Sequence, residues 1–121
     1  MNKDLKHSLS PIAYAVTQEK ATEAPFSGTY HDFSESGSYL CVCCQALLFT
    51  SKEKFYSSCG WPAFHKALEN TTREVEDLSH NMQRTEILCK NCDAHLGHKF
   101  ADGPSGTRYC INSVSLKFVA D

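Results

Sequence analysis

The chain has 121 residues, a length that suits one domain with one hydrophobic core. Its hydrophobic content of 41% and net charge of -2 are ordinary for a globular protein, and they offer no basic surface for nucleic acid. No apolar run approaches the roughly 20 residues that cross a bilayer, and residues 1–16 lack the apolar core of a signal peptide. We therefore expect a cytoplasmic protein with neither a nucleic-acid partner nor a membrane partner.

The first part of the chain predicts one short helix. Residues 1–9 are polar and are expected to form a flexible N-terminus, followed by a single domain over residues 10–121. Ser10 and Pro11 have the residue types of a helix N-cap and of the first helical position, so the segment IAYAVTQEKA is predicted to be helical. Pro25 ends any helical pattern.

From Tyr39 onward, short runs of β-favouring residues alternate with turn signals, which predicts a mainly β, mostly antiparallel domain with few short helices. The loop at Gly60-Trp61-Pro62 is predicted to lead into a short turn or helix over Ala63–Leu68. A polar connection over residues 69–81 is expected to contain a short strand near Val75. The predicted strands are Tyr39–Val42, Ala46–Phe49, Arg84–Leu88, His95–Phe100, Thr107–Val114 and Leu116–Val119.

Seven cysteines stand out in a chain of this length, and four of them form two C-x-x-C pairs. Cys41 and Cys44 make the first pair, and Cys89 and Cys92 make the second. Two tight turns of this kind supply four thiolates for a structural Zn²⁺ ion. A thioredoxin-like redox centre is the alternative, but the surrounding β-α-β pattern is missing. Cys43 lies inside the first pair and is an alternative ligand to Cys44, although the spacing favours Cys44.

The segment Arg108-Tyr109-Cys110-Ile111-Asn112 places polar and apolar side chains on alternate faces of a predicted strand. Arg108, Cys110 and Asn112 share one face, and Tyr109 and Ile111 share the other. A guanidinium near a thiol favours the nucleophilic thiolate. The alternative is that Cys110 is a small buried core residue, as most lone cysteines are.

His95 and His98 follow the second cysteine pair and are candidate proton donors. In a regular strand they would face opposite ways, but Gly97 permits a bulge that brings both rings to one side. A histidine pair that titrates near neutral pH can protonate a leaving oxygen. The alternative is one exposed histidine and one hydrogen-bonded histidine.

Cys59 and Trp61 lie in a loop that also contains glycine and proline. Such a cysteine suits a resolving thiol that reaches a second cysteine after a shift of the loop, or it is an incidental surface thiol. The indole ring of Trp61 either holds a small apolar or cationic group or anchors the loop.

Taken together, these motifs resemble those of one known family, the B-type peptide-methionine (R)-S-oxide reductases. The similarity covers roughly residues 10–119. The matching segments, in order, are PFSGTY (25–30), CVCC (41–44), CGWPAF (59–64), RTE (84–86), CKNCDAHLGHKFADGP (89–104) and RYCINSVSLKF (108–118).

The resemblance implies a compact domain of two antiparallel sheets and a role for each matched residue. Cys110 would attack the sulfur of methionine-R-sulfoxide, and Cys59 would resolve the resulting sulfenic acid into a disulfide that thioredoxin reduces. His95, His98 and Asn112 would hold and protonate the sulfoxide oxygen, and Arg108 would favour the thiolate. Trp61 and Phe100 would contact the substrate. The residues implied as ligands of the structural zinc are Cys41, Cys44, Cys89 and Cys92.

The chain departs from the family pattern at a few positions, and two other functions compete with the reductase. The loop Gly103–Arg108 is shorter than the usual form, and Gln45 and Asn81 stand where glycine is common. These changes affect turns rather than the chemistry. One competing function is a zinc module that binds a partner without catalysis. The other is a redox sensor that uses Cys59 and Cys110 without turning over a substrate.

Overall fold

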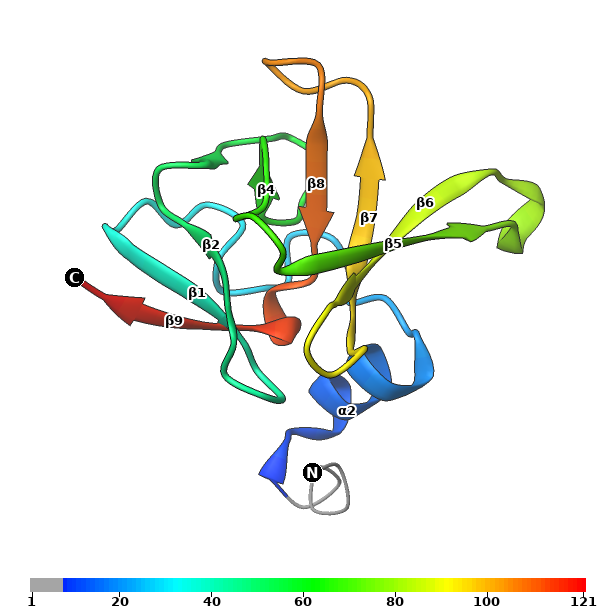
Figure 1. Ribbon diagram of the computed structural model, residues 1–121, viewed down its shortest axis with the longest axis horizontal. Helices are drawn as coiled ribbons and strands as arrows, with labels where there is room; N and C mark the ends of the chain where they lie inside the picture. Colours follow the sequence, from blue (N-terminus) through cyan, green and yellow to red (C-terminus); the bar gives the residue numbers. More distant parts are fainter. Residues whose placement is uncertain (1–7) are drawn as a thin grey trace.

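A computed structural model describes residues 8–121 of the chain, and within them two antiparallel sheets pack together beside one helix (Figure 1). The helix is α2 (Pro11–Glu19). The three-stranded sheet has the order β2 (Leu47–Thr50), β1 (Gly37–Cys41), β9 (Leu116–Ala120). The six-stranded sheet has the order β3 (Lys54–Phe55), β4 (Ala63–Phe64), β8 (Arg108–Ile111), β7 (His95–Phe100), β6 (Arg84–Cys89), β5 (Thr72–Asp77). Two short 3₁₀ helices are η1 (Ser79–Asn81) and η2 (Ser113–Ser115). The predicted fold class is confirmed.

Helix α2 begins and ends for local reasons. The Ser10 hydroxyl accepts a hydrogen bond from the backbone N–H of Ala13, and Pro11 takes the first helical position, as the sequence predicts. The helix ends at Glu19 because Lys20 adopts a left-handed conformation, with φ of 61°. Its buried side packs against β7 and η2. Within residues 8–121, no helix has the length and apolar composition that crossing a bilayer requires.

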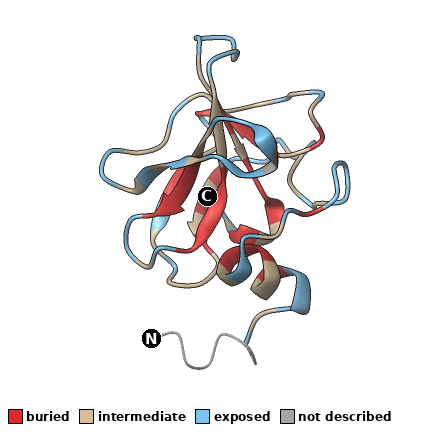
Figure 2. Cartoon of the chain, turned by 90° about the vertical axis from the view of Figure 1, so that its right-hand side faces the viewer, coloured by how far each residue is buried: buried red, intermediate tan, exposed pale blue. Residues whose placement is uncertain are grey.

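Aromatic side chains hold the two sheets together. Phe49 of the three-stranded sheet stacks on Phe64 of the six-stranded sheet, with ring centroids 4.1 Å apart. Tyr39 meets Phe64 edge-on at 5.1 Å, and Tyr109 approaches Phe49 at 6.0 Å. Such pairs add about 0.5–1.5 kcal/mol each beyond the area that they bury. The buried residues accordingly lie between the sheets, and the outer faces and loops are exposed (Figure 2).

Two predicted elements differ in the structure. The helical option for Ala63–Leu68 is wrong, because the fully buried pair Ala63–Phe64 forms strand β4 between β3 and β8. The strand predicted over Thr107–Val114 runs only from Arg108 to Ile111. It ends there because the chain turns into η2 directly after Asn112, whose backbone N–H still bonds to the Leu96 carbonyl oxygen of β7.

Two other strands change the predicted outline of the six-stranded sheet. The expected short strand near Val75 is a six-residue strand, β5, which pairs with β6 along its whole length. The β5–β6 hairpin projects to the right in Figure 1, away from the three-stranded sheet. The two-residue strand β3 was not predicted at all. Of the segment predicted to be flexible, residues 1–7 lie outside the described residues.

Candidate active site and metal centre

One face of the six-stranded sheet carries most of the candidate catalytic residues. Cys110 of β8 pairs across the strands with His98 of β7 and with Ala63 of β4. Two residues further along β7, Phe100 pairs with Arg108 of β8. Directly opposed residues share a face, so these side chains lie together. Tyr109 and Ile111 are buried against the core on the other face, as strand alternation predicts.

The thiols of Cys59 and Cys110 lie close together at this face. Their Sγ atoms are 3.7 Å apart, and the Cys59 thiol also donates to the Trp61 carbonyl oxygen at 3.5 Å. The loop therefore brings Cys59 beside Cys110 without the larger loop shift that the sequence suggests. Both cysteines are partly exposed.

The contact between the two sulfurs shifts their pKa values in opposite directions. The hydrogen bond from the Cys110 thiol, aided by Ser57, lowers the pKa of Cys59 to about 5 despite its partial burial. The same hydrogen bond, together with burial, raises the pKa of Cys110. The positive charge of the Arg108 guanidinium favours both thiolates, so it reduces the rise in the pKa of Cys110 and adds to the fall in the pKa of Cys59. In the reduced pair, Cys59 is therefore the more acidic thiol.

A bulge in β7 places His95 and His98 on the same side of the sheet. Gly97 pairs with Ile87, and His95 pairs with the next residue along β6, so Leu96 is the extra residue. The two imidazole rings lie 5.5 Å apart, centroid to centroid. The predicted bulge that brings both rings to one side is therefore present, although its extra residue is Leu96 and not Gly97.

Each imidazole is held by a carboxylate. His95 Nδ1 lies 2.8 Å from Glu86 Oε2, and both side chains are almost fully buried. His98 Nε2 lies 2.7 Å from Asp77 Oδ2. Burial lowers the pKa of His95 even though Glu86 favours its charged form. Hydrogen bonds from Ser79 and from His98 hold the pKa of Asp77 below its usual range.

A small pocket of about 80 Å³ opens beside Cys110. Five of its lining residues were singled out from the sequence: Trp61, His98, Phe100, Cys110 and Asn112. His95 lies in an adjoining hollow of about 400 Å³, together with Glu86 and Asp77. His98 lines both spaces, so the two histidines approach the pocket from neighbouring positions.

Glu23 connects two walls of this pocket through its main chain. Its carbonyl oxygen accepts a hydrogen bond from Trp61 Nε1 at 3.0 Å, and its N–H donates to Asn112 Oδ1 at 3.0 Å. The Asn112 side-chain amide donates to the Leu96 carbonyl oxygen at 3.0 Å. Trp61 and Asn112 are therefore fixed before any ligand arrives.

Arg108 is positioned by an aromatic ring and a carboxylate. Its guanidinium carbon lies 4.5 Å from the centre of the Phe100 ring, and its Nε donates to Asp102 Oδ1 at 2.8 Å. Arg108 does not line the pocket but acts on Cys59 and Cys110 through its charge.

Sequence reasoning missed the supporting residues Glu23, Asp77, Glu86 and Asp102. Glu86 had a usable signal, since strand alternation from Arg84 places it on the same face as the paired His98. Glu23 had none, because it acts through its backbone from a loop.

The four paired cysteines form a cluster that fits a tetrahedral metal ion. Cys41 Sγ lies 3.6 Å from Cys92 Sγ, Cys44 Sγ lies 3.6 Å from Cys89 Sγ, and all four sulfurs lie within 4.8 Å of one another. A Zn–S distance near 2.3 Å in a tetrahedron corresponds to sulfurs about 3.8 Å apart. The donor set and its spacing therefore match Zn²⁺.

Two matching turns shape this cluster. Gln45 follows the first pair with φ of 68°, and its N–H bonds to the Cys41 carbonyl oxygen at 2.8 Å. Asp93 follows the second pair with φ of 64° and bonds to the Cys89 carbonyl oxygen at 2.7 Å. The positive φ explains why glycine suits the position of Gln45. Cys43 lies outside the cluster and accepts a hydrogen bond from Gln18 Nε2 at 3.4 Å.

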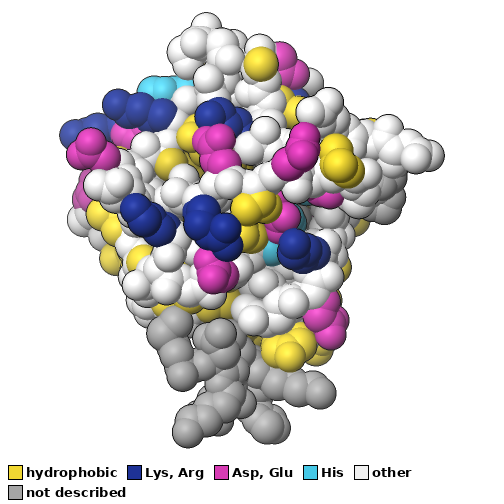
Figure 3. Space-filling model, turned by 45° about the vertical axis from the view of Figure 1, so that its right-hand side comes forward, with side chains coloured by type: hydrophobic (Ala, Val, Ile, Leu, Met, Phe, Trp, Pro, Cys, Tyr) yellow, Lys and Arg dark blue, Asp and Glu magenta, His cyan; other side chains and the backbone are white. Residues whose placement is uncertain are grey.

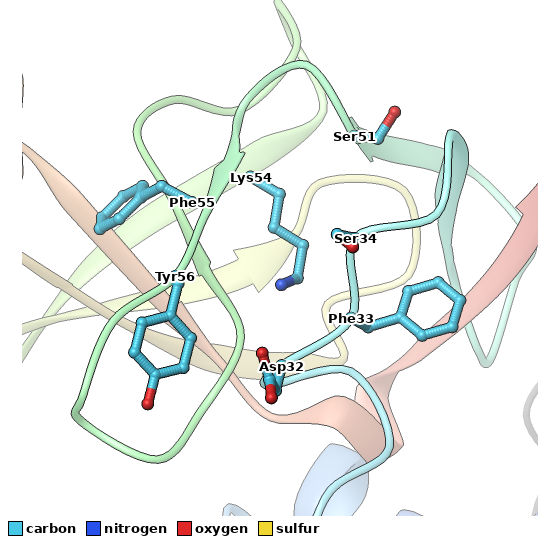
Figure 4. Close-up of a pocket in the computed structure, with 7 residues that line it drawn as sticks. All are labelled: Asp32, Phe33, Ser34, Ser51, Lys54, Phe55 and Tyr56. Atoms are coloured by element: carbon cyan, nitrogen blue, oxygen red, sulfur yellow. The ribbon is translucent and has the colours of Figure 1, made fainter.

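The rest of the described surface adds no comparable constellation. A hollow of about 130 Å³ beside β3 is lined by aromatic rings, with Lys54 extending toward Asp32 (Figure 4). Burial lowers the pKa of Lys54, and Asp32 partly offsets this. On the face shown in Figure 3, basic and acidic side chains are interspersed. That face therefore lacks the continuous basic patch that nucleic acid would need.

Comparisons with known proteins agree with this geometry. Proteins called peptide methionine sulfoxide reductase MsrB from Hahella chejuensis and Thioalkalivibrio sulfidiphilus are each 52% identical to the chain. The alignments cover 97% and 98% of this chain and 86% and 89% of those proteins, respectively. The protein of that name from Acinetobacter baylyi is 48% identical over 98% of this chain and 88% of its own.

A solved structure supports the fold alone. The Mis18 'Yippee-like' domain superposes with a TM-score of 0.59 at 16% identity, covering 72% of this chain and 98% of that one. The family model for the SelR domain matches residues 9–120, nearly the whole chain. With relatives about half identical over almost their full length, the chain belongs to the SelR domain family.

Proposed function

We propose that this protein is a peptide-methionine (R)-S-oxide reductase that repairs oxidised proteins, with residues 10–121 as its single catalytic domain. The observation that carries the proposal is the pair of thiols, Cys59 and Cys110, 3.7 Å apart beside a pocket lined by Trp61 and His98. A purely structural zinc module would have no need of this second thiol pair. Membership of a family whose relatives are named for sulfoxide reduction supports the same conclusion.

In the first step, the Cys110 thiolate attacks the sulfur of the sulfoxide. A sulfur–sulfur bond forms while the sulfur–oxygen bond of the substrate breaks, and the oxygen, protonated twice, leaves as water. Water then attacks Cys110 Sγ, the sulfur–sulfur bond breaks, methionine leaves, and Cys110 holds a sulfenic acid. Oxide is a poor leaving group unless protonated, so His98 protonates it, and His95, which is neutral in the resting protein, relays a proton to it through water. Asn112 holds the oxygen, and Arg108 stabilises the attacking thiolate.

The pocket selects the substrate by the shape of its apolar wall. The indole of Trp61, held in place by Glu23, and the ring of Phe100 line the pocket that contains Cys110. A methyl group fits this wall while the sulfoxide oxygen faces the histidine side. Methionine sulfoxide has a chiral sulfur, so once methyl and oxygen are placed in this way, the two epimers differ in where the rest of the methionine lies relative to Cys110. We propose that the R epimer, whether free or in a peptide, is the one that fits.

In the second step, the Cys59 thiol attacks the sulfenic sulfur of Cys110. A disulfide forms, the sulfur–oxygen bond breaks, and water leaves. Since a disulfide measures about 2.0 Å, the two sulfurs need to close only a short gap from 3.7 Å. A cytoplasmic dithiol protein of the thioredoxin type then reduces the disulfide by exchange.

Zinc has a structural role in this proposal. Cys41 is the last residue of β1 and Cys44 lies in the turn that follows it, while Cys89 is the last residue of β6 and Cys92 lies in the turn before β7. An ion bound by all four thiolates would join the two sheets and contribute to the folding free energy. It would lie outside the pocket, because none of the four lines it.

The experiment that tests the proposed function is an activity assay on separated sulfoxide epimers with dithiothreitol as the reductant. Turnover of the R epimer and not the S epimer is expected. No turnover of either would contradict the proposal and favour a binding module or a sensor.

A further inference from the structure

Phe26 has a backbone conformation that phenylalanine rarely adopts. Its φ is 64°, in the left-handed region. Pro25 precedes it, and the N–H of Ser27 bonds to the Ala24 carbonyl oxygen at 3.2 Å, which is the arrangement of a type II turn. The position that Phe26 takes in such a turn favours glycine. Turn formation therefore does not explain why an aromatic residue stands here.

The ring of Phe26 lies across the residue that follows Cys59. The Phe26 N–H donates to the Gly60 carbonyl oxygen at 2.7 Å. A Cβ added to Gly60 would meet the Phe26 ring at 3.0 Å and the Pro25 Cβ at 2.7 Å. His31 meets the ring edge-on, with centroids 5.4 Å apart. Despite these contacts, Phe26 is 57% exposed, so a large apolar surface is held in solvent beside Cys59.

This surface is separate from the substrate pocket. The segment that carries Phe26 contributes Thr22 to the pocket and the Glu23 carbonyl to Trp61, but Phe26 itself does not line the pocket. Cys59 does not line it either. Phe26 and Cys59 thus neighbour each other outside the pocket, and Cys110 lies between Cys59 and the substrate.

We propose that Phe26 is the apolar contact on which a protein dithiol reductant docks when it attacks Cys59. The inference rests on the proposed function, because it concerns the disulfide that this function forms. Cys110 lies within the sheet between β4 and β7 and lines the pocket, whereas Cys59 lies in a loop outside the pocket, and the exposed Phe26 ring lies against its neighbour Gly60. A protein that contacts Phe26 is therefore placed beside Cys59 rather than over the pocket, and exposed aromatic side chains are the residues that most often dominate binding at protein interfaces.

The exchange reaction balances with this geometry. A thiolate of the reductant attacks Cys59 Sγ, a mixed disulfide forms, and Cys110 leaves as a thiolate stabilised by Arg108. The second thiol of the reductant then attacks the reductant's first sulfur, which is bonded to Cys59 in the mixed disulfide. Cys59 leaves as a thiolate, and the reductant carries away the disulfide. Two electrons pass from the reductant to the Cys59–Cys110 pair.

The test is a Phe26→Gly variant of the full chain, assayed with two reductants. Glycine suits the positive φ, so the variant is expected to fold with a melting temperature close to that of the original protein. With thioredoxin, regenerated by its reductase and NADPH, the KM for thioredoxin should rise about tenfold, the loss typical of one interface anchor. The rate with dithiothreitol, which needs no docking surface, should not change.

Two control variants sharpen the result. Phe26→Tyr keeps an aromatic ring and should keep the KM for thioredoxin near its original value. Ile12→Ala removes an apolar side chain of similar exposure (46%) from helix α2 and should not change that KM.

Three outcomes would overturn the proposal or its basis. An unchanged KM for thioredoxin in Phe26→Gly overturns the docking role. An equal loss of rate with dithiothreitol also overturns it, because it would assign Phe26 to the substrate. Absence of any R-sulfoxide reduction by the original protein with dithiothreitol would instead contradict the proposed function itself.

Discussion

The Sγ atoms of Cys59 and Cys110 lie 3.7 Å apart in the reduced protein, although the two residues come from a loop and from the centre of a sheet. This proximity couples the two proposed steps. The thiol that later closes the disulfide is already within hydrogen-bonding distance of the thiol that attacks. Loss of either sulfur therefore has a different and measurable effect.

Replacing Cys110 by serine should abolish reduction of R-sulfoxide with any reductant, because a serine hydroxyl is a far weaker nucleophile than a thiolate. The activity should fall by at least about a thousandfold, as in triad enzymes that lose their nucleophile. Methionine release with dithiothreitol is the measurement. Substantial residual activity would show that another thiol attacks.

Replacing Cys59 by serine should leave single-turnover methionine release intact and remove thioredoxin-dependent cycling. The reason is that Cys110 can still attack, but its sulfenic acid has no neighbouring thiol. Rapid mixing with one equivalent of R-sulfoxide, compared with steady-state turnover, separates the two effects. Unimpaired cycling would mean that another cysteine resolves, with Cys43 as the first to test by a double variant.

Replacing Cys110 by alanine should raise the pKa of Cys59 above its value of about 5, because the hydrogen bond from Cys110 is the main cause of that low value. Cys59 in the original protein should then react with iodoacetamide well below pH 7, and in the variant only at higher pH. Mass spectrometry of the labelled peptide gives the pH profile. Identical profiles would contradict the effect of Cys110 on the pKa of Cys59.

Replacing Cys89 by alanine should remove bound zinc and lower the melting temperature strongly, because three ligands hold the ion poorly and the ion contributes to folding. Cys43→Ala is the matched control, since Cys43 lies outside the four-sulfur cluster. It should keep about one zinc per chain. Elemental analysis measures the zinc content per chain of both variants. A full zinc content in Cys89→Ala would contradict the ligand set.

His95 should make the protein less stable as the pH falls below about 6.5, the ordinary value for histidine. Burial lowers the pKa of His95 in the folded state, so below that pH the unfolded chain binds a proton that the folded chain does not bind. Proton binding by the unfolded chain lowers the free energy of unfolding. The loss from this one group is at most about 1.4 kcal/mol per pH unit.

A His95→Asn variant isolates this effect from the other histidines and from the metal ligands, which titrate in both proteins. Its free energy of unfolding, measured with urea between pH 7.5 and 5.5, should depend less on pH than that of the original protein. Parallel curves for the two proteins would contradict the buried, neutral state of His95.

Much of the fold could be predicted from local patterns. Ser10 and Pro11 define the start of α2 because capping depends on neighbouring residues only. The alternation around Cys110 correctly separates the face of Cys110 from the buried face of Tyr109. The pairing of β4 with β8 could not be predicted, because Ala63–Phe64 becomes a strand only when the neighbouring strands supply hydrogen-bond partners.

The residues of the candidate site that lie in a motif could be predicted from the sequence. The residues that hold them in place through hydrogen bonds from distant parts of the sequence could not. The C-x-x-C spacing identified the four clustered cysteines. Gln45 and Asn81 stand where the family often has glycine, and both have a positive φ, the conformation that glycine adopts most easily. Glu23 was missed because it acts through its backbone across a long separation in sequence.

The most direct test of the central claim is a single-turnover experiment on the reduced, zinc-loaded protein without any external reductant. With excess methionine-R-sulfoxide, about one methionine per chain should form, and peptide mapping should find one new disulfide between Cys59 and Cys110. Formation of methionine from the S epimer, or oxidation of the chain without a Cys59–Cys110 disulfide, would contradict it.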